Sequence, residues 1–191
     1  MRSVLISAIL FLAGASAIQA QDSYFGDAAA SYHWVRSNAG PGDCGCFGLN
    51  GGGLSGSLNL HGPWSAVADF SVEHTGNGAP IGNPLTLSSF LVGARYQIPQ
   101  PWFEGNHQPQ PFAQILVGAT HAAGAVAGVA EGNIEFSSRV GGGIDIPINS
   151  HFAVRAVEID YFITTFTNAT NNHQNNLLVG AGVVYHWSHK K

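Results

Sequence analysis

Charged side chains are scarce in this sequence, since Asp, Glu, Lys and Arg make up only 9 % of its 191 residues. Typical soluble domains carry roughly 25 % charged residues, and disordered chains are rich in charge and poor in aromatic residues. This sequence instead is 45 % hydrophobic, with 11 Phe, 5 Tyr and 4 Trp, and its formal net charge is only -4. The composition excludes a disordered chain, disfavours a soluble domain and suits a protein whose surface contacts lipid.

Basic clusters and long apolar runs are also missing from the chain after residue 20. Without a run of Lys and Arg, nothing indicates binding to nucleic acid, and we set that class of partner aside. No apolar segment there reaches the ~20 residues that a transmembrane helix needs. A membrane location would therefore require strands rather than helices.

The first 20 residues have the pattern of a secretory signal peptide. Arg2 supplies a positive charge, residues 4–15 form an apolar run, and small residues follow. An apolar run of this length is typical of a signal peptide and too short for a membrane anchor. The sequence therefore predicts a signal peptide over 1–20 and a mature domain over 21–191.

Eight segments of the mature chain alternate apolar and polar residues, which is the period of a strand with two different faces. They span residues 23–36, 54–61, 64–75, 85–98, 111–121, 133–146, 153–166 and 176–188. Most have about the ten residues that a tilted strand needs to cross a bilayer. Because every backbone group must be paired in lipid, an even number of such strands is expected to close on itself. The predicted fold class is an all-β, eight-stranded antiparallel up-and-down transmembrane β-barrel.

The connections between these segments test the scheme. If the chain starts on the periplasmic side, the outer loops are the longer connections, and they would cover 37–53, 76–84, 122–132 and 167–175. The turns at 61–64 and 147–150 are short, as expected on the inner side. Residues 99–110 are long and rich in Pro, and they count against the scheme.

Aromatic residues gather at the ends of the predicted strands. In a membrane barrel such residues form girdles at the two interfaces. The predicted girdle consists of Trp34, Trp64, Tyr96, Trp102, Tyr185 and Trp187.

The signal peptide, the eight alternating strands and the closing Val183-Val184-Tyr185-His186-Trp187 resemble the OmpA/OmpX-like family of small outer-membrane β-barrels. The resemblance covers essentially the whole mature chain and rests on pattern, without a unique motif. It implies a bacterial outer membrane, contact with outer-membrane lipid, and a last aromatic residue, here Trp187, that the barrel-assembly machinery reads. The chain departs from the family pattern in the four residues that follow Trp187.

The polar faces of the strands carry Asp27, Asp145 and a further set of charged residues. Because an eight-stranded barrel is just wide enough for side chains to fill it, charges inside must pair or stay hydrated. We predict an interior charge network formed by Asp69, Glu73, Arg95, Glu135, Arg139, Glu158 and Asp160. The alternative is that these residues line a gated ion path or a proton-linked site.

Cys44 and Cys46 are the only cysteines, and they fall in the first predicted outer loop. A pair of cysteines in an oxidising compartment predicts a disulfide, here closing a very small ring that is easily reduced. The alternative is a link to another molecule. Two Cys and the distant His33 do not match zinc-site spacing, so we predict neither a metal nor another cofactor.

One segment, Glu73-His74-Thr75-Gly76-Asn77, is loosely similar to the His-x-Ser-Asn pattern of lipid A deacylases. Gly76 occupies the nucleophile position, and His74 is expected to face lipid. We therefore predict no catalytic residues and no enzymatic activity.

The leading hypothesis is a non-enzymatic outer-membrane barrel that serves envelope integrity or surface contact through its outer loops, whose partner is unknown. Three alternatives remain: a narrow channel, a lipid A-modifying enzyme, and a soluble lipocalin-like barrel with its apolar faces inside. Alternation alone does not distinguish the inside of a barrel from its outside. The aromatic girdle, the low charge and the C-terminal aromatic residue favour the membrane barrel.

Overall fold

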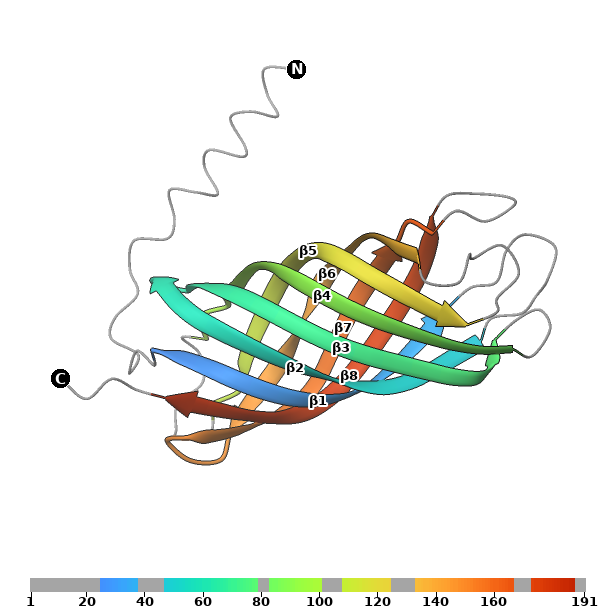
Figure 1. Cartoon of the computed structure of the whole chain (residues 1–191). Coiled ribbons are helices and arrows are strands. Elements are labelled where there is room, and N and C mark those ends of the chain that lie inside the picture. The colour runs from blue at the N-terminus through green and yellow to red at the C-terminus, as the bar shows by residue number, and fades with distance from the viewer. Residues whose placement is uncertain are drawn as a thin grey trace, which may run out of the picture.

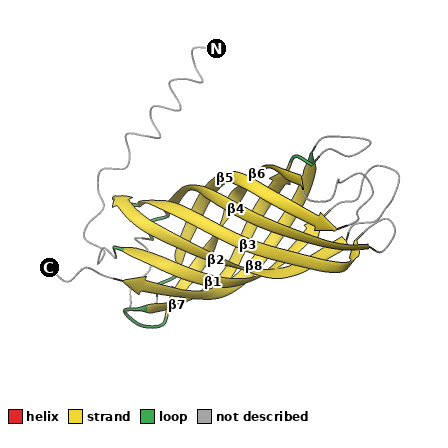
Figure 2. Cartoon of the chain, in the orientation of Figure 1, coloured by secondary structure: helices red, strands yellow, loops and turns green. Residues whose placement is uncertain are grey.

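The computed structural model describes residues 25–37, 47–78, 83–100, 108–124, 133–166 and 173–187 (Figure 1). The predicted signal peptide lies outside these residues. All regular secondary structure in the described ranges is β-strand, as Figure 2 shows. In the same ranges, no helix is long and apolar enough to cross a membrane.

Eight antiparallel strands form one closed barrel in sequence order, and β1 pairs with β8 to complete it. This confirms the predicted fold class. The strands are β1 (Gly26–Ser37), β2 (Phe47–His61), β3 (Trp64–Gly78), β4 (Asn83–Gln97), β5 (Gln110–Gly124), β6 (Asn133–Pro147), β7 (Phe152–Thr164) and β8 (Gln174–Trp187).

The two ends of the barrel differ in their connections. One end holds Gly26, the first residue of β1, paired with Trp187, the last residue of β8; we call it the terminal end. It carries the connections 62–63, 98–109 and 148–151. We call the other end the loop end, and it carries the connections 38–46, 79–82, 125–132 and 165–173. At the terminal end 62–63 and 148–151 are short, as predicted, whereas 98–109 is longer than any connection at the loop end. At the loop end 79–82 is as short as 148–151, and the other three connections are longer.

The first predicted loop, 37–53, is too long, because β2 already begins at Phe47. This stretch contains Gly48 and the run Gly51–Gly53, which have no side chains and therefore show no alternation. Their backbones nevertheless pair with β1, for example Gly51 with His33. In the same way β3, β4, β5 and β8 extend by a few residues into the predicted loops 76–84, 122–132 and 167–175.

Apolar side chains cover the outside of the barrel. The structure thus shows which face of the strands points outward, a question that alternation could not answer. Exposed examples are Leu54 (64 %), Phe90 (57 %), Ile115 (54 %) and Val183 (57 %). The inward positions between them are largely polar, and many of those side chains are fully buried. A soluble protein rarely exposes so large an apolar surface, whereas a barrel in lipid has an apolar band outside and a polar interior.

A β-bulge interrupts the alternation of β7. Its register against β8 shifts between Arg155 and Glu158, and its register against β6 shifts between Ile144 and Asp145. Ala156 and Val157 therefore lie between two inward-facing residues where a regular strand would have one. The bulge turns Arg155 into the barrel, where it is 1 % exposed.

A layer of apolar side chains fills the interior towards the loop end. It comprises Val35, Leu49, Leu85, Leu87, Ala122, Phe162, Phe166 and Leu178, with Phe47 packed against it. We call it the apolar layer. The polar residues described next lie between this layer and the terminal end. The interior side chains are therefore largely apolar towards the loop end and largely polar nearer the terminal end.

Candidate functional site

The most elaborate part of the molecule is the polar network inside the barrel, and its terminal half is built around Arg155. The Arg155 guanidinium donates to both oxygens of Asp145, with Nε–Oδ1 at 2.9 Å and Nη2–Oδ2 at 3.1 Å. Its Nη1 donates to Oε2 of Glu158 at 2.9 Å. Such two-pronged pairing fixes the orientation of both groups as well as their separation.

Phe112, on β5, joins this cluster to a second arginine. The Arg155 guanidinium carbon lies 4.7 Å from the centre of the Phe112 ring, and that of Arg95 lies 4.5 Å from it. Both distances are within the range of a cation–π interaction. Arg95 also pairs with Asp27, with Nη1–Oδ1 at 3.4 Å.

Gln114 connects the two halves of this cluster. Its side-chain oxygen accepts from Nη2 of Arg95 at 3.2 Å. Its amide nitrogen donates to Oε1 of Glu158 at 2.8 Å and to Oδ2 of Asp160 at 3.1 Å. An amide suits this position because it is donor and acceptor at once, and it links a cation to two neighbouring carboxylates.

A second cluster surrounds Arg139, nearer to the apolar layer. Arg139 Nη1 donates to Oδ1 of Asp69 at 2.9 Å, and Nη2 donates to the Ser71 hydroxyl at 2.6 Å. Nη2 also lies 3.7 Å from Oε1 of Glu73, and the same oxygen lies 3.1 Å from Nδ1 of His33. Arg139 and Glu73 are 0 % exposed, so protein groups rather than solvent surround each charge, and the buried Nε of Arg139 and Oε2 of Glu73 have no hydrogen-bond partner among the described residues.

The apolar layer and the Arg139 cluster meet at Phe162. The Arg139 guanidinium carbon lies 4.8 Å from the centre of the Phe162 ring, and Phe162 belongs to the apolar layer. Beside this contact, three hydroxyl groups form a buried chain: Ser89 and Thr120 are 2.9 Å apart, and Thr120 donates to Ser137 at 2.8 Å. On its loop side the polar network therefore borders the apolar layer.

Glycines make room for the larger side chains of the network. A Cβ atom at Gly53 would lie 2.6 Å from Cε1 of His33, and one at Gly180 would lie 3.0 Å from its Cδ2. Gly143 likewise makes room for Phe112, because a Cβ atom at Gly143 would lie 2.8 Å from Cζ of the Phe112 ring. Side chains that span a narrow barrel thus lie against strands that carry none, which accounts for part of the high glycine content.

Six of the seven residues predicted for the interior network are buried, and five of them form ion pairs. Asp160 is held instead by Gln114. The seventh, Glu135, is half-buried opposite Thr120 and forms no ion pair with a described residue.

Sequence reasoning missed Arg155, the residue with the most extensive pairing. By strict alternation Arg155 shares a face with Val157 and would point to lipid. The signal that could have found it is its charge, because an arginine in the middle of a lipid-facing strand is costly. Gln114 and His33 are also absent from the predicted network, although both are buried and contact its charged residues.

The predicted girdle divides between the two ends of the barrel. Trp64, Tyr96, Tyr185 and Trp187 lie at the terminal end, and Trp34 lies towards the loop end. Trp64 and Tyr96 pack edge to face with ring centres 4.9 Å apart, and Tyr185 packs against Phe152 at 5.2 Å. Trp102, Cys44 and Cys46 lie outside the described residues.

The two polar residues considered for catalysis lie on opposite faces of β3. Glu73 points inward and contacts His33, whereas His74 is exposed and lies 2.9 Å from the Thr86 hydroxyl. They therefore do not form one site. In the part of the chain that the structure covers, no three His, Cys, Asp or Glu side chains gather into a metal-binding group.

Comparison with known proteins gives a family and a set of similar folds. The model of the outer membrane protein beta-barrel domain family matches residues 5–186. The crystal structure of Neisserial surface protein A (NspA) is similar with a TM-score of 0.61 and 12 % identity, over 85 % of this chain and 97 % of that chain. Ail, the attachment invasion locus protein of Yersinia pestis, solved in complex with the heparin analogue sucrose octasulfate, has a TM-score of 0.50 and 15 % identity, over 83 % and 98 %. No curated protein sequence matches.

These findings agree with the architecture. At such low identity the two solved structures establish the fold alone, a small antiparallel barrel. The family model covers nearly the whole chain, and it describes proteins of the outer membrane. The apolar outer surface and the polar, filled interior are those expected of such a barrel. The chain belongs to the outer membrane protein beta-barrel domain family and is an outer-membrane barrel protein.

Proposed function

We propose that this protein is a non-enzymatic, non-conducting barrel that contributes to envelope integrity or surface contact through its outer loops. The terminal end faces the periplasm, and the connections 38–46, 79–82, 125–132 and 165–173 face outward. This orientation is supported by the turns 62–63 and 148–151 at the terminal end, which are shorter than three of the four connections at the loop end. Small outer-membrane barrels have short periplasmic turns and longer outer loops.

The observation that carries this proposal is the filled interior. Arg139, Glu73 and Asp160 are 0 % exposed, although an open pore would leave such side chains in contact with water. The apolar layer adds a second obstacle, because moving an ion past it requires the ion to lose its hydration. The interior charges thus act as a structural core rather than as the lining of a pore.

Planar-bilayer recording tests this proposal against the channel alternative. We expect no stepwise conductance from the refolded barrel over a range of salt concentrations and voltages. A matched variant, Phe162→Ala with Leu178→Ala, thins the apolar layer and keeps the polar network, so we expect it to show no conductance either. Regular conductance steps from the unmodified protein would contradict the proposal.

The enzyme alternative has less support, because Glu73 and His74 lie on opposite faces of one strand. An acid and a base that cannot reach one substrate do not activate a nucleophile. We expect mass spectra of lipid A to be identical in cells with and without the protein. A mass difference equal to one acyl chain would establish an enzyme.

Surface contact is tested in a deletion strain. We expect loss of the protein to weaken either resistance to detergent or attachment of the cells to a surface. Heparin is a reasonable first coating, because Ail was solved with the heparin analogue sucrose octasulfate and shares this fold. Unchanged resistance together with unchanged attachment to all coatings would contradict the proposed role.

We also propose that the machinery that assembles outer-membrane barrels recognises the C-terminal strand through Trp187. Its indole packs against Gly26, where a Cβ atom would lie 3.0 Å from the ring. Trp187→Ala should lower the amount of folded barrel in cells, whereas Trp187→Phe should not. N-terminal sequencing of the protein from membranes tests the predicted signal peptide, with Gln21 as the expected first residue.

A further inference from the structure

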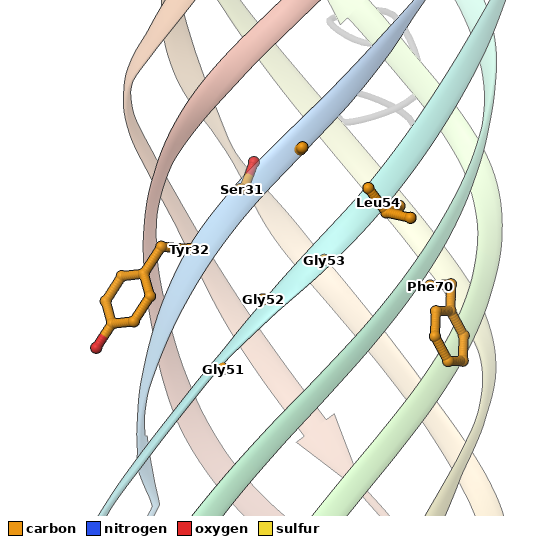
Figure 3. A pocket seen from close by; sticks show the side chains of 8 residues that line it. Ser31, Tyr32, Gly51, Gly52, Gly53, Leu54 and Phe70 are labelled. Carbon is orange, nitrogen blue, oxygen red and sulfur yellow. The ribbon is translucent and has the colours of Figure 1, made fainter.

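An apolar groove runs along the outside of the barrel across β1, β2 and β3. Its floor is the backbone of Gly51–Gly53, which has no side chains, together with Ala30. Tyr32 borders the groove on one side, and Leu54 and Phe70 stand on the other (Figure 3). These three side chains are 58 %, 64 % and 48 % exposed, so they project from the barrel and enclose a recess between them.

The shape of this groove suits a hydrocarbon chain. In lipid, the hydrophobic effect contributes little to the association of two apolar surfaces, because neither is exposed to water. Such surfaces associate through close van der Waals packing instead. Glycine permits that packing because a partner can approach the backbone itself. An extended acyl chain is narrow enough to lie on the glycine floor, and the flanking aromatic rings can contact its methylene groups from both sides.

A row of polar side chains crosses the same face next to the groove. The register places Trp34, Asn50, His74 and Thr86 side by side on β1 to β4. The Tyr32 hydroxyl donates to Oδ1 of Asn50 at 2.6 Å, and His74 lies 2.9 Å from the Thr86 hydroxyl. Such a row marks the depth at which the apolar band gives way to lipid headgroups.

Arg36 lies beyond this row, at the loop end of β1. Among the charged residues that the structure describes, it alone is exposed, and it forms no ion pair with a described residue. It is four residues beyond Tyr32 on the same face of the strand, about 13 Å at the usual rise per residue. Its guanidinium is therefore placed at headgroup depth and is suited to a phosphate, which it can bind with two parallel hydrogen bonds.

We propose that this groove binds one acyl chain of a phosphorylated lipid of the outer leaflet, with the lipid phosphate beside Arg36. The proposal rests on the orientation given above, in which the loop end faces outward. The groove supplies the packing and Arg36 supplies the charge complementarity. Together they distinguish this lipid from the others around the barrel.

Native mass spectrometry of the full mature chain tests the proposal. The protein is released from nanodiscs that contain phosphatidylcholine and diphosphoryl lipid A, and the lipids it retains are counted. Ala30→Leu fills the groove, whereas Ala28→Leu, two residues away and also outward-facing, adds the same side chain outside it. Arg36→Gln keeps the groove and removes the charge.

We expect Ala30→Leu to lower lipid A retention about fivefold, a change of roughly 1 kcal/mol in binding, while Ala28→Leu stays within about twofold of the wild type. Arg36→Gln should lower the retention of lipid A more than that of phosphatidylcholine, because the choline cation of phosphatidylcholine neutralises the charge of its phosphate. A boiling-dependent gel shift confirms that each variant is folded before it is compared.

Several outcomes would overturn the proposal. Equal retention by wild type and Ala30→Leu would show that the groove holds no lipid, and equal losses in Ala30→Leu and Ala28→Leu would show a general surface effect. A dimer that Ala30→Leu abolishes would assign the groove to a second copy of the chain.

Failure of the proposed function can be told apart from failure of the lipid proposal. Conductance steps would overturn the proposed function and leave the retention result standing. Loops resistant to protease on intact cells would overturn the orientation and, with it, the assignment of the bound lipid to the outer leaflet.

Discussion

Arg155 and Glu158 are three residues apart on one strand, yet their side chains form an ion pair inside the barrel, with Nη1–Oε2 at 2.9 Å. In a regular strand, residues three apart point to opposite faces. The bulge at Ala156 and Val157 removes this difference and places both side chains on the inner face. The central pair of the polar network therefore depends on one irregularity of the backbone.

Replacing Arg155 tests how much this pairing contributes to stability. Arg155→Met leaves Asp145 and Glu158 buried without their cation, and loss of one partner of a buried ion pair typically costs about 3–5 kcal/mol. We expect a loss of that size in the free energy of unfolding, measured by urea titration of the barrel in lipid vesicles. Ala156→Val, exposed at the same bulge, should change it by less than about 0.5 kcal/mol. A loss below about 1 kcal/mol for Arg155→Met would show that water takes over the pairing.

Two glycines of β2 offer a matched test of the space reserved for His33. Gly53→Ala places a Cβ atom 2.6 Å from the His33 ring, whereas a Cβ atom at Gly56 has no neighbour within 4 Å. Overpacking of this kind costs about 1–3 kcal/mol, and Gly56→Ala should be neutral or slightly stabilising. The same urea titration measures both variants. Equal effects would mean that the His33 ring moves aside freely.

Phe112 is expected to matter through its two arginines as well as its volume. Phe112→Leu removes the ring that faces both Arg95 and Arg155, and each desolvated cation–π contact is worth about 1–2 kcal/mol. We expect a loss of about 2–4 kcal/mol in the free energy of unfolding. Phe90→Leu, at an exposed position on the lipid side, is the control and should cost less than about 1 kcal/mol. The prediction is wrong if the two variants are equally stable.

The aromatic pair at the terminal end can be measured by a double-mutant cycle. Trp64 and Tyr96 pack edge to face at 4.9 Å, and such pairs contribute about 0.5–1.5 kcal/mol beyond the area they bury. Replacing both by alanine, singly and together, should give a coupling energy in that range. A cycle between Trp64 and Phe152, on the non-neighbouring strands β3 and β7, should give none. A coupling of equal size in both cycles would point to a change in the whole barrel.

Alternation along the sequence was enough to predict the number of strands, their order and most of the charged residues inside the barrel. Alternation at Asp69, Arg95 and Arg139 has a direct physical cause, because successive side chains of a strand point to opposite faces. That pattern holds wherever residues carry side chains and the strand is regular. It fails at Gly51–Gly53, where there are no side chains to alternate, and the start of β2 was consequently placed too late.

The arrangement of the interior depends on contacts between strands and could not be predicted from the sequence. The inward turn of Arg155 depends on a bulge that forms through pairing with two neighbouring strands, and local sequence does not encode it. Asp69 and Arg139, or Phe112 and Arg95, are distant in the chain, and barrel closure and register bring them together. The choice between an apolar inside and an apolar outside is equally global. It depends on which face of every strand is turned inward when the barrel closes, and here that face carries the buried arginines and carboxylates, including Arg139 and Asp160.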